Sequence, residues 1–274
     1  MRVPGRAGLV FAAIGLAGSL AGCATPPPAS QPDALAQFKA TNDPLEPFNR
    51  KMYAVNNTLD RYALRPAAVA YTKVVPEVAR TGIHNALSNL AAPVKIGNDM
   101  LQGRPRHAGD SLMRFVINTT IGGLGFFDVA TKLGYPDHDT DFGLTLARWG
   151  AGSGPYLFLP VLGPGGPRDT SGRVVDLASD PLNYFGQGAA VTAAHWSRFG
   201  LTLVDARAQL LGTISQIRRT ALDPYATFRS LYRQHRDSQV ETVREAEQGT
   251  IPAWYPRPEA ATTPATGPSP TPAR

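Results

Sequence analysis

Apolar side chains recur at helical spacing along most of the chain. The clearest early example comprises Phe48, Met52, Val55, Leu59 and Tyr62, which would share one face of a helix. Polar side chains fill the positions between them, chiefly Asn49, Arg50, Asn56, Asn57 and Asp60. This pattern predicts an amphipathic helix with one apolar and one polar face.

The residues before this helix predict where it starts. Asp43 is a candidate cap, Pro44 suits the first helical position, and Glu46 has the spacing of a capping box. Arg65-Pro66 is expected to end the helix, because the residue before a proline is disfavoured in helical geometry.

The same periodicity predicts further helices. Residues 106–121 form the clearest expected core helix, with Leu112, Phe115, Val116 and Thr119 on its apolar side. A helix predicted to begin at Pro76 would carry Val78, Ile83, Leu87 and Leu90 on one face, and a helix at 141–149 would have Asp141 as its cap. The other predicted helices span 67–75, Pro93 to Gly103, 170–178 and 189–219, and a last one follows Asp223-Pro224.

Two apolar stretches do not fit a helix. Residues 121–130 combine Leu124, Phe126 and Phe127 with close-set glycines, and 155–160 is a short apolar run bounded by prolines, expected to be extended. Each stretch would suit either a protein core or a lipid environment. Alternating strand patterns are scarce elsewhere, so the predicted fold is mainly α: a single domain of amphipathic helices with Gly/Pro-rich apolar loops.

The first residues have the form of a secretory signal. A basic start, Arg2 and Arg6, precedes an apolar run that ends at Leu20-Ala-Gly-Cys23. Cys23 is the only cysteine, and its setting resembles a bacterial lipobox, which implies cleavage before Cys23 and acylation of that residue. The prediction divides the chain into a signal at 1–22, a lipidated Cys23 with a Pro-rich extended linker to residue 40, a helical domain at 41–248, and a disordered Pro/Thr/Ala-rich tail at 249–274.

Composition narrows the classes of partner. The chain has 27 Lys and Arg against 21 Asp and Glu, and the signal removes two of these basic residues. No dense basic block occurs, so we do not expect nucleic acid as a partner.

Sequence motifs for catalysis and cofactor binding do not assemble. Ser153 has Ala151 and Pro155 where a nucleophile elbow needs glycines, and there is no phosphate-binding Walker sequence. The histidines lack zinc-type spacing, and the aspartates at 137–141 have Phe142 where a calcium loop needs Gly. We therefore expect no catalytic residue, cofactor or metal.

Several motifs together resemble the VacJ/MlaA family of lipoproteins. The resemblance begins with the segment Asn42-Asp-Pro-Leu-Glu-Pro-Phe-Asn-Arg50 and extends to His235. The family-motif positions are Asp43, Pro44, Phe48, Asn49, Arg50, Asp128, Gly154, Pro155, Tyr156, Pro160, Arg168 and Asp169. Thr140 and Leu144 depart from the residues usual in the family.

The resemblance implies a ring of helices embedded in the inner leaflet of the outer membrane. Such a protein takes misplaced phospholipids from the outer leaflet and passes them to a periplasmic lipid carrier, in some cases beside a trimeric porin. The polar faces near Asn49, Arg50, Asn56 and Asn57, and Asp128, are candidates for lining the lipid path. Candidate lipid contacts on the apolar loops are Leu124, Phe126, Phe127, Leu157 and Phe158. Two alternatives stay open: a structural envelope lipoprotein that binds peptidoglycan or other envelope proteins, and a lipid-modifying hydrolase.

Overall fold

The computed structural model describes residues 27–28, 30–41, 43–184, 186 and 188–245. The signal, Cys23 and the tail at 249–274 lie outside these residues, so the structure does not test their predicted roles. The elements in chain order are α2 (Pro32–Thr41), α3 (Glu46–Leu59), the π-helix η2 (Asp60–Leu64), α4 (Arg65–Val74), α5 (Glu77–Leu101), α6 (Pro105–Thr120), α7 (Val129–Lys132), α8 (Phe142–Arg148), β1 (Leu157–Leu159), β2 (Gly163–Gly165), α9 (Pro167–Ser179), the 3-10 helix η3 (Pro181–Asn183), α10 (Ala189–Gln209), α11 (Leu211–Thr220) and α12 (Pro224–Glu245).

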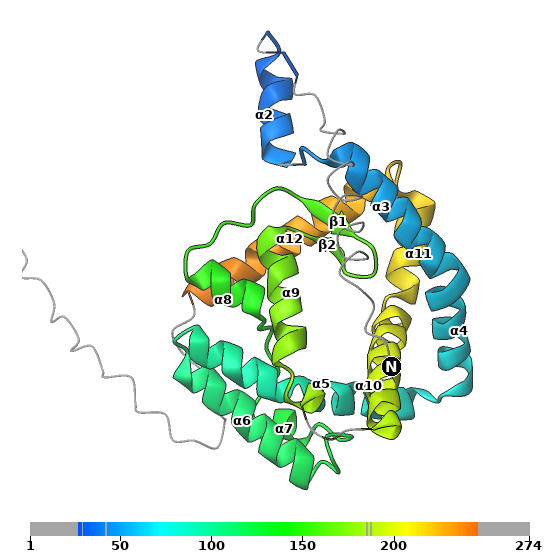
Figure 1. The fold of residues 1–274 in the computed structure, drawn as a ribbon, viewed down its shortest axis with the longest axis vertical. Coiled ribbons are helices and arrows are strands. Elements are labelled where there is room, and N and C mark those ends of the chain that lie inside the picture. Colours follow the sequence, from blue (N-terminus) through cyan, green and yellow to red (C-terminus); the bar gives the residue numbers. More distant parts are fainter. Residues whose placement is uncertain (1–26, 29, 42, 185, 187, 246–274) are drawn as a thin grey trace, which may run out of the picture.

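The helices are arranged as a ring (Figure 1). In this view α3, α4 and α11 form one side, α5 and the end of α10 form the base, and α8, α9 and α12 form the opposite side. Helix α6 packs along α5, α8 packs on α9, and α10 packs on α4. The predicted mainly α fold is therefore confirmed.

The apolar segment at 155–160 is extended, as predicted. Its residues Leu157–Leu159 pair with Gly163–Gly165 in a short antiparallel hairpin, with Phe158 opposite Pro164. The hairpin packs on α3 and α12. It thereby joins the first and last helices of the ring, which are far apart in sequence.

The prediction that Arg65-Pro66 ends the first helix is wrong. Helix α3 continues through η2 into α4, with Pro66 in the first turn of α4. The Arg65 amide donates to the Asp60 carbonyl, five residues back, so the hydrogen-bonding register shifts just before the proline. The π-turn thus accommodates the missing proline N–H without breaking the rod.

Two other helix boundaries also differ from prediction. Pro93 does not begin a helix but lies inside the 25-residue α5, which packs along α6 on both sides of it. The single helix expected at 189–219 is divided at Leu210, which caps α10 and precedes α11. Long-range packing outweighs the local signal in the first case, and it redirects the chain in the second.

The segment before α3 differs from its prediction in two ways. Residues 32–40, expected as part of the extended linker, belong to α2, which ends at Thr41. Asp43 does not cap α3 with its side chain, and the helix begins at Glu46 with Leu45 as N-cap. By contrast, Asp141 caps α8 as predicted, accepting a hydrogen bond from the Leu144 amide at 2.8 Å.

The amphipathic helices are inverted relative to a water-soluble fold. In α3 and η2, Asn49 is fully buried and Asp60 is buried, whereas Val55, Leu59 and Tyr62 are exposed. In α6, Ser111 and Asn118 are buried, and Leu112 and Val116, expected in the core, are exposed. Val78 and Leu90 of α5 are likewise exposed. Among the residues that the structure describes, buried apolar side chains form three small clusters instead of one large core, for example Tyr156, Phe158 and Tyr225.

Within the described part of the chain, every helix is too short or too polar to cross a membrane.

Candidate functional site

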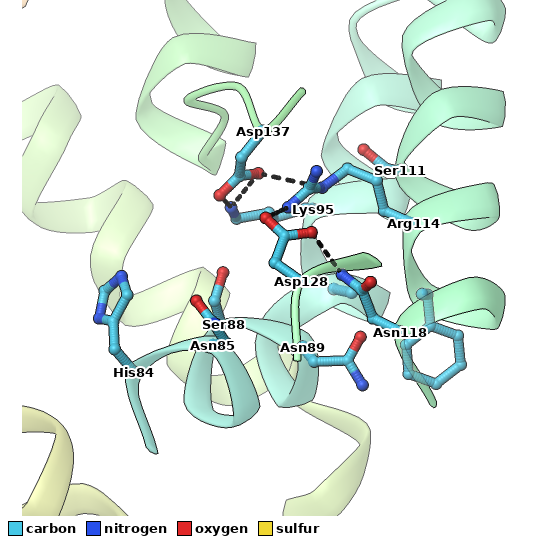
Figure 2. Close-up of a pocket in the computed structure, with 12 residues that line it drawn as sticks. His84, Asn85, Ser88, Asn89, Lys95, Ser111, Arg114, Asn118, Asp128 and Asp137 are labelled. Atoms are coloured by element: carbon cyan, nitrogen blue, oxygen red, sulfur yellow. Dashed lines mark hydrogen bonds and ion pairs between the residues drawn. The ribbon is translucent and has the colours of Figure 1, made fainter. Parts of the chain in front are cut away.

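A polar cavity lies where α5, α6 and the loops around α7 meet (Figure 2). Helix α5 contributes a polar stripe at helical spacing, and α6 contributes a second one that faces it. The cavity has a volume of about 210 Å³. Its lining is His84, Asn85, Ser88, Asn89, Ala92 and Lys95 of α5, Ser111, Arg114, Phe115 and Asn118 of α6, and Asp128 and Asp137 from the loops.

Four charged side chains converge on this cavity from α5, α6 and the two loops that flank α7 (Figure 2). Lys95 Nζ donates to both carboxylate oxygens of Asp137, at 2.9 and 3.0 Å. Arg114 Nη2 donates to Asp128 Oδ2 at 3.1 Å, and its Nε lies 3.9 Å from Asp137 Oδ1. The cavity therefore presents two cations and two carboxylates, each partnered by the opposite charge.

Asn118 and Asp128 fix the loop that closes one side of the cavity. Asn118 Oδ1 accepts hydrogen bonds from the amides of Val129 and Ala130 at 3.0 and 2.9 Å, and its Nδ2 donates to Asp128 at 3.1 Å. Asp128 also caps α7 by accepting from the Thr131 amide. These bonds satisfy the free amides of a short helix and hold the Asp128 carboxylate toward Arg114.

Both carboxylates are ionised at neutral pH. Burial alone would raise the pKa of Asp137, but the Lys95 ammonium and then Arg114 hold it below its usual range. Burial likewise acts to raise the pKa of Asp128, and hydrogen bonds from Thr131 and Asn118 with the charge of Arg114 outweigh it. The cavity is thus a site of paired full charges that can exchange partners with a charged ligand.

His84 connects the cavity to the opposite side of α5. Its Nδ1 lies 2.9 Å from Asp205 Oδ2 of α10, and Tyr71 of α4 donates to the same carboxylate at 3.2 Å. A second pocket of about 290 Å³ lies around this contact, between α4, α5 and α10. The polar lining therefore continues from the first cavity towards α10.

Most of the family-motif positions hold the fold together. Asn49 Nδ2 donates to Asp43 Oδ1 at 2.8 Å and to the Tyr156 carbonyl at 3.0 Å, and Asn49 Oδ1 accepts from the Phe158 amide at 2.9 Å. Asp43 also accepts from Tyr225 at 2.6 Å and from Arg229 at 2.5 Å. One buried network thus joins the segment before α3, the β-hairpin and α12.

A second motif network lies at the start of α9. Asp169 accepts hydrogen bonds from Arg168 Nε at 2.9 Å, from Tyr232 at 2.8 Å and from Arg236 at 2.9 Å. The neighbouring Gly154 has a φ of +69°, and a Cβ there would lie 2.9 Å from Pro167. The packing of Gly154 against Pro167 therefore requires glycine at this position.

The remaining motif positions are more exposed. Arg50 pairs with Glu46 and with Asp223 on the surface, and its guanidinium lies 4.6 Å from the centre of the Tyr225 ring. Pro44, Phe48 and Pro160 are half-buried, and Pro155 is exposed. Of the twelve motif positions, Asp128 lines the polar cavity.

The candidate lipid contacts separate into two groups. Leu124 and Phe127 are 75% and 59% exposed, on a loop held by glycines with positive φ, while Phe126 and Leu157 are half-buried. Phe158 is only 3% exposed and packs edge-on against Tyr53, so it does not lie exposed as Leu124 and Phe127 do, and its contact with lipid stays a prediction. Strand alternation explains this result, because Phe158 points to the opposite side of β1 from Leu157 and Leu159.

The predicted site does not include Lys95, Arg114 or His84, and the sequence places Asp137 only in an acidic loop. A usable signal exists in α5, where Asn85, Asn89, Ala92 and Lys95 recur at spacings of three and four. The pattern alone does not show that this polar stripe lines a cavity, because an amphipathic helix is normally expected to bury its apolar face.

The fold and the cavity define a class of protein: a mainly helical ring with clusters of charged side chains buried in it and many of its apolar side chains exposed. The family model described as MlaA lipoprotein matches residues 41–239. The chain belongs to the MlaA lipoprotein family.

Related proteins support this assignment. The chain is 36% identical over 216 residues to the intermembrane phospholipid transport system lipoprotein MlaA of Haemophilus influenzae, covering 77% of this chain and 84% of the relative. It is 38% identical to the protein of the same name from Escherichia coli, covering 72% and 77%. A solved structure described as the structural basis for maintenance of bacterial outer membrane lipid asymmetry matches with a TM-score of 0.61 at 38% identity, over 72% of this chain and 98% of that one.

Proposed function

We propose that this protein removes phospholipids from the outer leaflet of the outer membrane and passes them to a periplasmic lipid carrier. This activity would maintain the lipid asymmetry of the outer membrane. The observation that carries the proposal is the inverted helix: buried Asn49 and Asp60 lie on the same rod as exposed Val55 and Leu59. Family membership and the function given in the relatives' names support the same conclusion.

Moving a phospholipid between leaflets changes no covalent bond. It requires a polar route for the headgroup and apolar surfaces beside the tails, because a charged group in hydrocarbon is costly. The cavity between α5 and α6 supplies opposite charges of the kind a headgroup carries, through Lys95, Arg114, Asp128 and Asp137. The exposed Leu124 and Phe127 supply apolar surface of the kind that acyl chains contact.

We further propose that Cys23 anchors the chain to the periplasmic face of the outer membrane. Several acyl chains on this one residue would attach the protein stably to the membrane, whereas a single acyl chain would not. The N-terminal peptide of the purified protein should then begin at Cys23 and carry the lipid mass by mass spectrometry. An unmodified Cys23 would rule out the anchor without affecting the proposed transport path. A periplasmic carrier and a trimeric porin are the partners proposed for the assembled system.

The test of the transport proposal is a deletion strain with plasmid complementation. The strain should accumulate outer-leaflet phospholipid, measured by an acyltransferase that modifies only surface-exposed phospholipid. The wild-type gene should restore the normal level, and a gene carrying Lys95→Asp with Arg114→Asp should not, at equal protein abundance. Normal outer-leaflet composition in the deletion strain would contradict the proposal.

Detergent dependence separates this function from a structural envelope lipoprotein. A protein lacking Cys23 but embedded through its apolar faces should still need detergent for purification. A body that is monodisperse in buffer without detergent, together with an unchanged outer leaflet in the deletion strain, would favour the structural role.

A further inference from the structure

A third cavity, distinct from the one between α5 and α6 and from the pocket around His84 and Asp205, lies where α3 and η2 approach α10 and α11. Its volume is about 290 Å³. One part of its lining is apolar, and the other part is polar and charged. The apolar side chains are Leu64, Phe158, Pro164, Leu210, Ile214 and Phe228, and the polar ones are Tyr53, Asn56, Asn57, Asp60, Arg207 and Arg218.

The charges in this cavity do not balance. Arg207 donates through Nε and Nη2 to the two oxygens of Asp60, at 2.5 and 3.1 Å, and Arg218 Nη2 donates to Asp60 Oδ2 at 2.8 Å. Burial acts to raise the pKa of Asp60, but the two guanidiniums hold it below its usual range, so the carboxylate is charged. Two arginines therefore share one carboxylate, which leaves a net charge of about +1 in a largely buried cluster.

Two guanidinium nitrogens of the cluster have no partner among the described residues. Arg207 Nη1 and Arg218 Nε are both buried, and neither makes a hydrogen bond within that part of the chain. Arg207 as a whole is only 7% exposed. Buried donors are almost always paired in folded proteins, and a buried N–H left without an acceptor costs free energy even when the rest of its guanidinium is paired. An anion in the cavity would accept from these donors and neutralise the excess charge.

The unpaired atoms include an acceptor as well. Asn57 Oδ1 is buried, has no hydrogen-bond partner in the described ranges, and lines the same cavity. A ligand that carries both an anion and a hydroxyl or ammonium donor would satisfy both kinds of group. A phospholipid headgroup has this composition, whereas inorganic phosphate offers no apolar part for the remaining walls.

Local backbone geometry places Asp60 in the cluster. Asp60 is the first residue of the π-helix η2, and its carbonyl accepts from the Arg65 amide. Single π-turns occur frequently at functional sites. The η2 segment packs on α10, which supplies Arg207, and α11 supplies Arg218 from the next helix.

We propose that the Arg207–Asp60–Arg218 cluster binds the phosphate group of a phospholipid whose acyl chain lies along Leu210, Ile214 and Phe228. The proposal rests on the transport function above and adds a second, anion-selective site to it. The ligand class is a phospholipid with a phosphodiester. Arg218 contacts the phosphate, and the apolar wall contacts the tail.

The test uses the full-length protein in a non-ionic, phosphate-free detergent. Native mass spectrometry would follow binding of dioctanoyl phosphatidylglycerol, with dioctanoylglycerol and inorganic phosphate as separate probes. Arg218→Gln should lower the affinity for the phospholipid about tenfold, because it removes a charge-assisted contact. Arg218→Lys, which keeps the positive charge, should bind the phospholipid more tightly than Arg218→Gln and more weakly than the wild type. The matched control Arg219→Gln, at the next and exposed position of α11, should stay within about twofold.

Ile214→Trp provides a second variant that leaves every charge in place. The larger side chain should weaken phospholipid binding because it fills the space beside the apolar wall. The midpoint of thermal unfolding of this variant should stay close to that of the wild type. Equal binding of dioctanoylglycerol, or unchanged binding by both Arg218→Gln and Ile214→Trp, would overturn the proposal. Binding of inorganic phosphate with the same affinity and the same dependence on Arg218 would also overturn it, because the ligand would then be free phosphate.

The deletion strain keeps the two proposals distinguishable. Normal outer-leaflet composition in that strain with Arg218-dependent lipid binding in vitro would refute the transport function and leave the site standing. A clear defect in the strain, with binding that is insensitive to Arg218, would refute the site alone.

Discussion

Arg236 of α12 donates to Asp169 of α9 through Nη2 at 2.9 Å and Nε at 3.1 Å. The same guanidinium donates to both oxygens of Asp141, the cap of α8, at 2.7 Å each. One side chain thereby ties α8, α9 and α12 together on one side of the ring (Figure 1). Burial acts to raise the pKa of Asp169, but Arg168 and then Arg236 hold it below its usual range.

Arg236→Met should destabilise the fold strongly. The substitution leaves the buried Asp169 with less compensation and removes both bonds to Asp141. Breaking such a buried pair costs about 3–5 kcal/mol. Chemical denaturation in detergent measures the change in the free energy of unfolding. The control is Asp237→Asn at the exposed neighbouring position, whose free energy of unfolding should stay within about 0.5 kcal/mol of the wild type. A loss below about 1 kcal/mol for Arg236→Met would contradict the role assigned to this network.

Asn49→Ala should also be costly, because one buried amide makes three hydrogen bonds, to Asp43, Tyr156 and Phe158. Each buried partner left without a bond costs about 1–3 kcal/mol. The matched control is Lys51→Ala on the exposed face of α3, which should change stability by less than about 0.5 kcal/mol. Equal effects of the two substitutions, measured by thermal unfolding, would show that the network does not hold the hairpin.

Two glycine substitutions should act in opposite directions. Gly125 has a φ of +89°, and a Cβ there would lie 2.4 Å from Asn89 Cβ, so Gly125→Ala should destabilise the fold and displace a residue of the polar cavity. Gly97 lies inside α5, and a Cβ at that position would meet no atom of another described segment within 4 Å. Gly97→Ala should therefore stabilise the fold by about 0.5–1 kcal/mol. The unfolding midpoints of both variants test these two predictions. A lower midpoint for Gly97→Ala would contradict the finding that a Cβ at position 97 meets open space.

Stability should fall with acidification because of His107. Burial and then the charge of Arg104 lower the pKa of His107 from 6.5 to about 4. Arg104 Nη2 and His107 Nε2 lie 2.6 Å apart, and an arginine can only donate, so Nε2 accepts and the folded ring is neutral. The unfolded state binds a proton below about pH 6.5 while the folded state does not. The contribution is therefore complete above that pH and is lost as the pH falls towards 4.

His107→Gln should remove this part of the pH dependence. Between pH 7 and pH 5 the wild type should lose about 1–2 kcal/mol more unfolding free energy than the variant. The matched control is His235→Gln, at an exposed position of α12, which should keep the wild-type loss of unfolding free energy between pH 7 and pH 5. The same pH slope for wild type and His107→Gln would refute the assignment.

Lipid contact should follow exposure along the two apolar segments. A photocrosslinking side chain placed singly at Leu124 or Phe127 in membranes should give phospholipid adducts, because both side chains are largely exposed. The same group at Tyr156 should give only protein adducts, since that position is buried beside Tyr225 and Tyr232. Absence of lipid adducts at Leu124 and Phe127 would contradict the prediction that this loop contacts lipid.

Most of the helical segments, and the start of several of them, follow from the sequence alone. Periodicity identified the amphipathic helices, Asp141 marked the start of α8, and the prolines around 155–160 marked an extended segment. These features depend on local backbone preferences and short-range hydrogen bonds, which neighbouring residues in the chain fix. The family motifs also identified the family, although most of those residues hold the ring together and do not line the cavity.

Only the tertiary structure decided which face of each helix points inward. Periodicity separates Val55 and Leu59 from Asn49 and Asp60 but is the same whether the apolar or the polar face is buried. Helix α5 passes Pro93, and η2 carries the chain past Pro66, because packing between distant helices outweighs the local break. The partners of Asp60 come from positions 207 and 218, and those of Asp43 from 225 and 229. Such contacts exist only once the ring has closed, which is why local pattern could not show them.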